Sequence, residues 1–192
     1  MTETNKIELK EFLILCILYL ILVIGTGLYR VNLMTDILDK DIIRIAKLSG
    51  TISMVLTSLF SVITIFLIGF ICKLIIDIFS FSLSSASLTR GLMFSVFTLV
   101  CFEVLRFFNA YLFLEESIKH IHNHEDLIEE IVKTRWHNVD QQLSKIMLFV
   151  SSIFFAFGLG KGSKLSWKKG IEIVIIGTIF LLGFYLSTIK LF

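Results

Sequence analysis

The sequence contains no proline among its 192 residues. Proline is the usual cause of sharp helix kinks, because it removes a backbone hydrogen bond and its ring clashes with the preceding turn. Transporters that bind their substrate at discontinuous helices commonly interrupt these spans with proline or glycine. The absence of proline therefore favours continuous helices and argues against a transporter of the broken-helix kind.

Charged residues are also scarce, at 18% of the chain, whereas 56% of the residues are hydrophobic. With a mean hydropathy of +0.88, the chain has more apolar surface than a soluble core of this size can bury. The formal net charge is only +2, so no basic surface of the kind that binds nucleic acid is expected. The composition predicts an integral membrane protein in contact with lipid.

Catalytic signatures are missing as well. Cys16, Cys72 and Cys101 lie in separate apolar segments, without a CxxC spacing and without a nearby histidine to activate a thiol. We expect them to pack as small apolar residues and not to form disulfides. The sequence has no GxSxG, HExxH or P-loop motif, so we expect neither an enzyme nor a cofactor.

Five apolar segments approach the length of about 20 residues that crosses a bilayer. They cover residues 12–29, 52–72, 92–114, 143–160 and 171–189. The fourth is apolar only from Ile146 and reaches spanning length when Leu143 and a snorkelling Lys145 are included; a count of four spans would make it re-entrant. The sequence thus predicts a single all-α membrane domain, a bundle of five transmembrane helices with amphipathic helices outside the membrane.

The first segment has features of a secretory signal, because Lys6 and Lys10 precede it. Bulky Tyr29 and Arg30 follow it at once, where a cleavage site would carry small residues. We expect an anchor that is not cleaved.

Lysines predict the orientation. The loop between the fourth and fifth segments holds Lys161, Lys164, Lys168 and Lys169. Short loops rich in lysine and arginine stay in the cytoplasm, so the amino terminus is predicted to be cytoplasmic and the carboxyl terminus extracytoplasmic. The isoleucine- and lysine-rich composition is typical of an AT-rich bacterial genome, and hence of the bacterial cytoplasmic membrane.

Two outward segments, residues 34–48 and 125–142, have apolar residues at helical spacing. In the first, Met34, Ile42 and Ile45 belong to a stripe that predicts a helix lying on the membrane surface. In the second, the stripe predicts an extramembranous helix that leads directly into the fourth span.

Glycines and charges mark candidate contacts inside the bundle. Gly170, Gly177 and Gly183 fall on roughly one face of the fifth segment and predict a close helix contact. Glu103 and Arg106 lie three residues apart near the middle of the third segment, where a charge is costly.

This charged pair has two interpretations. It could belong to an ion pathway, a proton relay or a partner-binding site, or it could be a buried pair that fixes helix register. Lys73 or Asp77 of the second segment could join the pair if the two helices are adjacent.

Three histidines, His120, His122 and His124, alternate in the stretch KHIHNHE. They share a face if the stretch is extended, and in a helix His120 and His124 would be neighbours that can hold zinc or copper. Neither geometry supplies a third ligand unless a glutamate or His137 folds back. We therefore predict a solvated loop and no metal.

Two stretches carry a resemblance to a known family: IGFICKLIIDIFSFSLSSASLTRGLMFSVFTLV and LSKIMLFVSSIFFAFGLGKGSKLSWKKGIEIVIIG. The first has an apolar helix, a short polar turn and a restart, and the second a span that ends in A-x-G-L before a lysine-rich turn and another span. With the five-span layout, the chain resembles the bacterial branch of the Yip1 family of membrane proteins. It lacks the proline often seen in that family's third span and the DLYGP-like stretch of eukaryotic members, so a role in vesicle trafficking is not carried over.

The resemblance implies a non-enzymatic protein that binds other membrane proteins, since bacterial relatives can accompany ABC exporters, including systems that resist peptide toxins. Our leading hypothesis is a membrane accessory or scaffold protein. One alternative is a small transporter or channel that uses Glu103 and Arg106 and forms a homo-oligomer. Another is a self-immunity protein against a membrane-active bacteriocin.

Overall fold

The computed structural model describes the backbone of residues 3–36, 40–119, 127–161 and 166–189, and side chains over 9–36, 42–119, 130–161 and 166–186. Within these ranges the helices are α1 (Glu3–Thr35), α2 (Lys40–Ile78), α3 (Ser85–Lys119), α4 (Leu127–Lys133), α5 (Arg135–Gly160) and α6 (Trp167–Ile189). All of them except the short α4 are long and apolar enough to cross a membrane. The predicted all-α polytopic bundle is confirmed.

The fourth predicted segment is long enough to span. α5 has 26 residues and is therefore about 39 Å long at 1.5 Å per residue. Its length and composition fit a full crossing, so a re-entrant segment is not needed.

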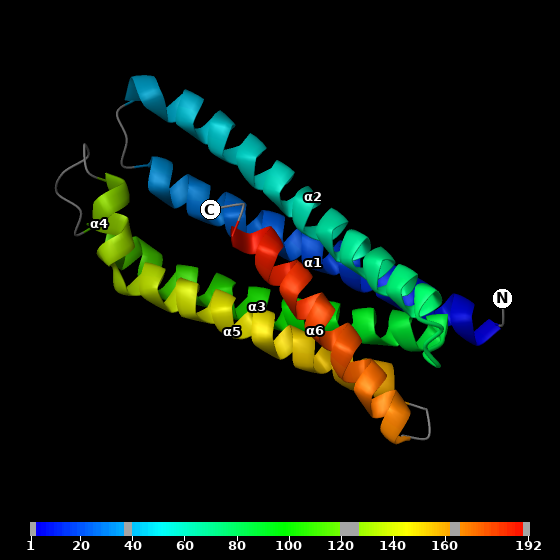
Figure 1. The fold of residues 1–192 in the computed structure, drawn as a ribbon. Coiled ribbons are helices and arrows are strands. Elements are labelled where there is room, and N and C mark those ends of the chain that lie inside the picture. The colour runs from blue at the N-terminus through cyan, green and yellow to red at the C-terminus, as the bar shows by residue number, and fades with distance from the viewer. Residues whose placement is uncertain (1–2, 37–39, 120–126, 162–165, 190–192) are drawn as a thin grey trace.

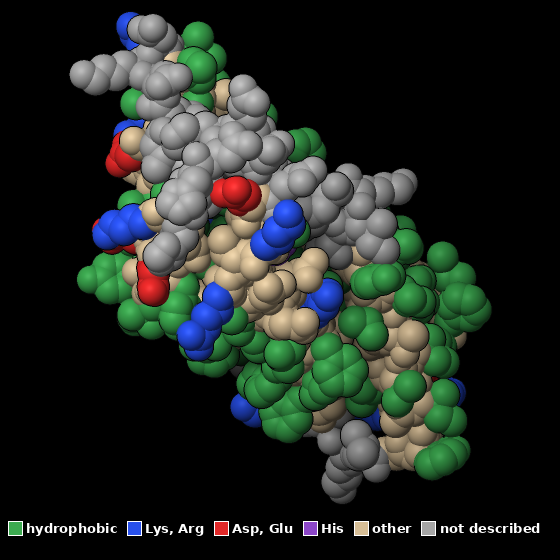
Figure 2. Space-filling view, turned by 90° about the vertical axis from the view of Figure 1, so that its left-hand side faces the viewer, with side chains coloured by type: hydrophobic (Ala, Val, Ile, Leu, Met, Phe, Trp, Pro, Cys, Tyr) green, Lys and Arg blue, Asp and Glu red, His purple; other side chains and the backbone are tan. Residues whose placement is uncertain are grey.

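Helices α1, α2, α3 and α5 run roughly along one direction, and α6 crosses them at an angle (Figure 1). One end of the bundle holds the start of α1, the turn between α2 and α3, the end of α5 and the start of α6; we call it the inner end, after the predicted orientation. The opposite end, which holds α4, is the outer end. The last turn of α6 reaches only the middle of the bundle, so the outer part is built without α6. Seen from the outer end, acidic and basic side chains lie beside broad hydrophobic surface (Figure 2).

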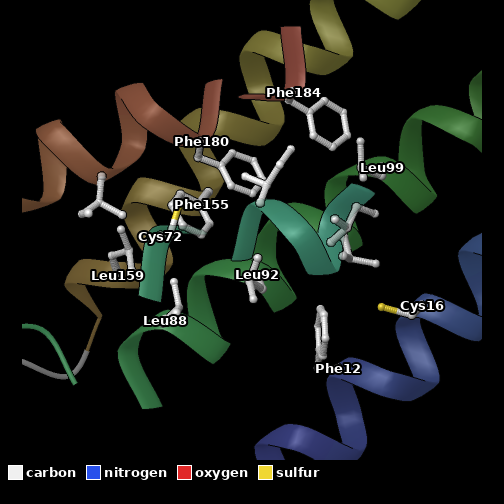
Figure 3. Packing of buried hydrophobic residues seen from close by; sticks show 14 of the residues in the cluster. Phe12, Cys16, Cys72, Leu88, Leu92, Leu99, Phe155, Leu159, Phe180 and Phe184 are labelled. Carbon is white, nitrogen blue, oxygen red and sulfur yellow. The ribbon is translucent and has the colours of Figure 1, made fainter. Parts of the chain in front are cut away.

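α3 is central, because it packs against α5, α1 and, less extensively, α2. The main core includes side chains from the five long helices (Figure 3). Phe155 of α5 and Phe180 of α6 stack in this core with their ring centroids 4.0 Å apart, and neither side chain is exposed. This stack fixes α6 against α5.

A close backbone contact lies between α3 and α5, at glycines that the sequence analysis did not select. A Cβ added to Gly158 would lie 2.8 Å from the carbonyl oxygen of Arg90 and 2.8 Å from the Cα of Gly91. Only glycine therefore lets these two backbones approach so closely.

The predicted glycine face of α6 is correct in part. A Cβ at Gly177 would lie 3.3 Å from Ala156, and one at Gly183 would lie 3.3 Å from Ile68, so both positions face a neighbouring helix. Gly170 has nothing within 4 Å of such a Cβ and does not take part in a helix contact. It lies near the exposed start of α6, beyond the region where neighbouring helices approach.

The predicted surface helix over residues 34–48 is wrong. α1 continues to Thr35, and α2 runs as one helix of 39 residues from Lys40 through the second span. No proline interrupts it, and Gly50 lies where α2 meets α1, since a Cβ there would be 2.9 Å from Val31. The apolar periodicity was therefore the start of a long spanning helix.

The second outward segment forms two helices instead of one. α4 ends at Lys133, and Thr134 caps α5 by accepting a hydrogen bond from the backbone N–H of His137. From Arg135, α5 continues into the fourth span, as the sequence predicts.

Candidate functional site

Two oppositely charged residues on α3, Glu103 and Arg106, form the predicted pair. Nη1 of Arg106 lies 3.1 Å from Oε2 of Glu103, one helical turn away. Glu103 is only 2% exposed. A carboxylate buried this deeply needs a fixed cation, which Arg106 provides.

Asp140 of α5 binds the same arginine in a bidentate manner, through both of its carboxylate oxygens. Nε of Arg106 donates a hydrogen bond to Oδ1 of Asp140, and Nη2 donates one to Oδ2; both are 3.0 Å long. Paired, charge-assisted bonds of this kind fix direction as well as distance. Asp140 thereby ties α5 to α3 at the level of Glu103.

Arg30 adds α1 to the group. Its Nη2 donates a 2.8 Å hydrogen bond to Oδ1 of Asp140. We call Arg30, Glu103, Arg106 and Asp140 the charge network. It holds two cations and two anions, joins α1, α3 and α5, and has no net charge.

Aromatic and amide groups close the outer side of the network. The guanidinium of Arg30 lies over the ring of Trp136, 5.3 Å from its centroid. Nδ2 of Asn109 donates to the backbone oxygen of Trp136 at 3.1 Å. Trp136 also belongs to a second apolar cluster with Ala110, Leu114 and Ile118. The start of α5 is thus held against α3 by both polar and apolar contacts.

The proposed partners from α2 do not take part. Lys73 and Asp77 are exposed near the inner end of α2, and no ion pair among the described residues includes them. Arg106 lies 21 residues after the start of α3 at Ser85, about 30 Å away along the helix. The two groups are separated by most of the membrane thickness.

Sequence reasoning missed Arg30 and Asp140 as partners because both lie just outside predicted apolar segments. The pairing of Arg106 with Asp140 follows from the antiparallel arrangement of α3 and α5. Arg106 lies about 16 residues outward from Arg90 on α3, and Asp140 lies about 18 residues back from Gly158 on α5. Because Gly158 contacts Arg90, Arg106 and Asp140 lie at the same level. The Gly158 contact that sets this register could not be recognised from the sequence.

A second buried carboxylate lies at the inner end. Glu172 of α6 is 3% exposed, and its Oε2 accepts hydrogen bonds from the backbone N–H and the hydroxyl of Ser82, at 2.9 and 2.7 Å. Ser82 belongs to the turn between α2 and α3, where Ser80 has a positive φ of 51°. Glu172 therefore ties α6 to this turn, a contact that the sequence analysis did not predict.

No metal centre is supported within the described part of the chain, where no group of three or more potential ligands gathers. His120, His122 and His124 lie outside the described residues. His137 is half-buried beside Trp136. An open cavity of about 310 Å³ at the outer end is lined by Phe113, Glu116, Ser117, Thr134 and Arg135, and by no member of the charge network.

The arrangement defines an all-helical, multi-pass membrane protein with an internally neutralised charge network. Comparison with known protein families, curated proteins and solved structures finds no match.

Proposed function

We propose that this chain is a non-enzymatic accessory or scaffold protein that binds another membrane protein through the outer part of α2. The observation that carries the proposal is the length of α2. Within the described residues it covers Ile42–Ile78, which is 37 residues and about 55 Å long. The hydrocarbon core of a bilayer is only about 30 Å thick.

The excess length lies at the outer end. Lys73 and Asp77 are exposed charges near the inner end of α2, so we place the inner membrane surface there, and a span of about 20 residues then ends near Ile52. Ile42, Ile45 and Leu48 then project beyond the membrane, with 53%, 72% and 63% of their surface exposed. Helix tilts of up to about 40° do not bring 55 Å of helix into 30 Å of lipid.

This exposed apolar face needs a protein cover. Exposed apolar patches outside lipid commonly mark interaction sites. Among the described segments, α1 lies beside the outer part of α2, whereas α6 ends near the middle of the bundle (Figure 1). A helix of a partner with an apolar stripe would cover Ile45 and Leu48. The resemblance to bacterial Yip1 proteins supplies the class of partner: an ABC exporter of the cell envelope, including systems that resist peptide toxins.

The charge network fits a structural role better than conduction. Every charge in it has an opposite partner within 3.1 Å, which leaves no uncompensated group for a passing ion. A small transporter centred on Glu103 would lose transport in a Glu103→Gln variant that still inserts. A full loss of this kind would favour conduction over the accessory role.

The test is site-specific photocrosslinking in native membranes, followed by mass spectrometry of the crosslinked product. A photoreactive residue at Ile45 or Leu48 is expected to capture one defined membrane protein. The control is Ile63, which lies on the same helix within the membrane and is half exposed, and which is expected to capture lipid.

Substitution gives a second readout. Ile45→Gln with Leu48→Gln is expected to abolish co-purification of the partner, whereas Val132→Gln, an exposed position on α4, leaves it unchanged. Recovery of the wild-type protein alone would contradict the proposal. If the captured molecule is a toxin peptide and the chain protects a sensitive strain from it, the self-immunity function replaces the accessory function.

A further inference from the structure

A shallow groove follows the seam between α1 and α3 near the inner end. Leu15 of α1 and Met93, Phe94 and Phe97 of α3 line it, and its volume is about 260 Å³. All four side chains are apolar, and Phe97 is 52% exposed. Because these residues belong to spanning helices, the groove opens toward the membrane interior, where a lipid acyl chain is the matching ligand.

A cation lies against Phe94, one of the residues that line the groove. Nζ of Lys161, the residue after the last turn of α5, is 4.8 Å from the ring centroid of Phe94. The side chain of Lys161 is exposed, so its ammonium can reach a second, anionic partner.

Arg90 places a second cation beside the first. It lies one turn before Phe94 on α3, and its Nη1 donates a 2.7 Å hydrogen bond to the backbone oxygen of Lys161. This bond also caps the carboxyl end of α5, where a positive charge is favourable. The close contact of Gly91 with α5 holds the two helix ends together, so the positions of both cations follow from the fold.

The order of groups along the groove is that of a phospholipid. Cations stand at the membrane surface, and apolar side chains follow from Phe94 to Phe97, one turn deeper. On α1, the carboxylate of Glu11 is exposed one turn before Leu15, but Lys10 precedes it, so α1 adds no net charge at this level.

We propose that this groove binds one anionic phospholipid, with its phosphate at Lys161, beside Arg90, and an acyl chain along Leu15, Met93, Phe94 and Phe97. Basic pockets between transmembrane helices are known to bind anionic headgroups. The site is independent of the partner surface on α2, because it lies at the other end of the bundle.

Native mass spectrometry tests the proposal. The purified full-length protein is mixed with equal amounts of phosphatidylglycerol and phosphatidylethanolamine that carry the same acyl chains. The wild type is expected to retain phosphatidylglycerol several-fold more than phosphatidylethanolamine. Lys161→Gln removes this preference, and Leu15→Trp, which fills the groove, lowers retention of both lipids. Lys145→Gln, an exposed lysine elsewhere on α5, leaves the preference intact.

Three outcomes would overturn the proposal. The first is equal retention of the two lipids by the wild type. The second is an equal effect of Lys161→Gln and Lys145→Gln, which would indicate diffuse charge instead of a site. The third is full lipid retention in Leu15→Trp. If that variant does not fold, Phe97→Ala, which removes an exposed wall of the groove, is expected to lower retention and serves as the groove test.

Discussion

At the scale of single residues, a buried charge matters because its removal leaves an oppositely charged partner without a counter-charge. Asp140 neutralises both Arg30 and Arg106, so its removal leaves two half-buried guanidinium groups with one carboxylate, Glu103. Exposed pairs behave differently. Lys119 and Glu115 form a pair 2.8 Å apart at the surface of α3, where water already solvates both charges.

We predict that Asp140→Asn lowers stability by about 3–5 kcal/mol, because breaking one partner of a buried ion pair leaves an uncompensated charge. Glu115→Gln should change it little. Both variants can be compared by denaturation of the purified protein in detergent, followed by size-exclusion chromatography. Equal stability of the two variants would show that water reaches the charge network freely.

Glu172 gives a second prediction at this scale. In Glu172→Ala the backbone N–H and hydroxyl of Ser82 lose their acceptor, whereas Glu172→Gln keeps an oxygen that can accept both bonds. Hydrogen–deuterium exchange of the turn at residues 79–84 should therefore rise strongly in the alanine variant and only slightly in the glutamine variant. Similar exchange in the two variants would argue against the carboxylate as the group that holds the turn.

At the scale of elements, packing between α3 and α5 depends on a backbone contact. A methyl group at Gly158 would meet the backbone of Arg90 and Gly91 at 2.8 Å, and backbone cannot rotate away as a side chain can. The helices would have to separate, which also displaces the hydrogen bond from Arg90 to Lys161.

We predict that Gly158→Ala lowers stability by about 1–3 kcal/mol, the usual cost of overpacking. Gly170→Ala is the matched control, since nothing lies near its added methyl group and alanine is the better helix former. The melting temperatures of both variants in one detergent measure the difference. A Gly158→Ala protein as stable as the wild type would mean that the two helices have room to shift.

The elements also show how far the sequence could predict the structure. Apolar length identified the five spans, because lipid imposes that length on any helix that crosses it. Apolar periodicity over 34–48 was misinterpreted, because a stripe on a surface helix and one on the end of a long span have the same pattern. Arg30 and Asp140 could not be assigned to Glu103 and Arg106, since the depth at which two helices meet depends on packing between them.

At the scale of the whole molecule, the two ends differ in how closely their helices are connected. The inner end is compact, with Glu172 tied to the turn at Ser82 and Arg90 tied to Lys161. The outer end extends α2 and α3 beyond α6. Which end faces the cytoplasm follows only from the distribution of lysines.

We predict that the inner end is cytoplasmic. In a protein whose three native cysteines are replaced by alanine, a cysteine at Ser80 should resist a membrane-impermeant maleimide in intact cells, whereas one at Arg135 should react; both positions are exposed. Permeabilised cells, in which both should react, provide the control. The reverse pattern would invert the topology.

The charge network also has an electrical consequence. A membrane potential does work of about 2.3 kcal/mol per 100 mV on each elementary charge that crosses the membrane. Arg30, Glu103, Arg106 and Asp140 sum to zero and lie at one level, so a joint displacement of the three helices would move no net charge through the field. Moving this network through the membrane field as a unit therefore takes no electrical work.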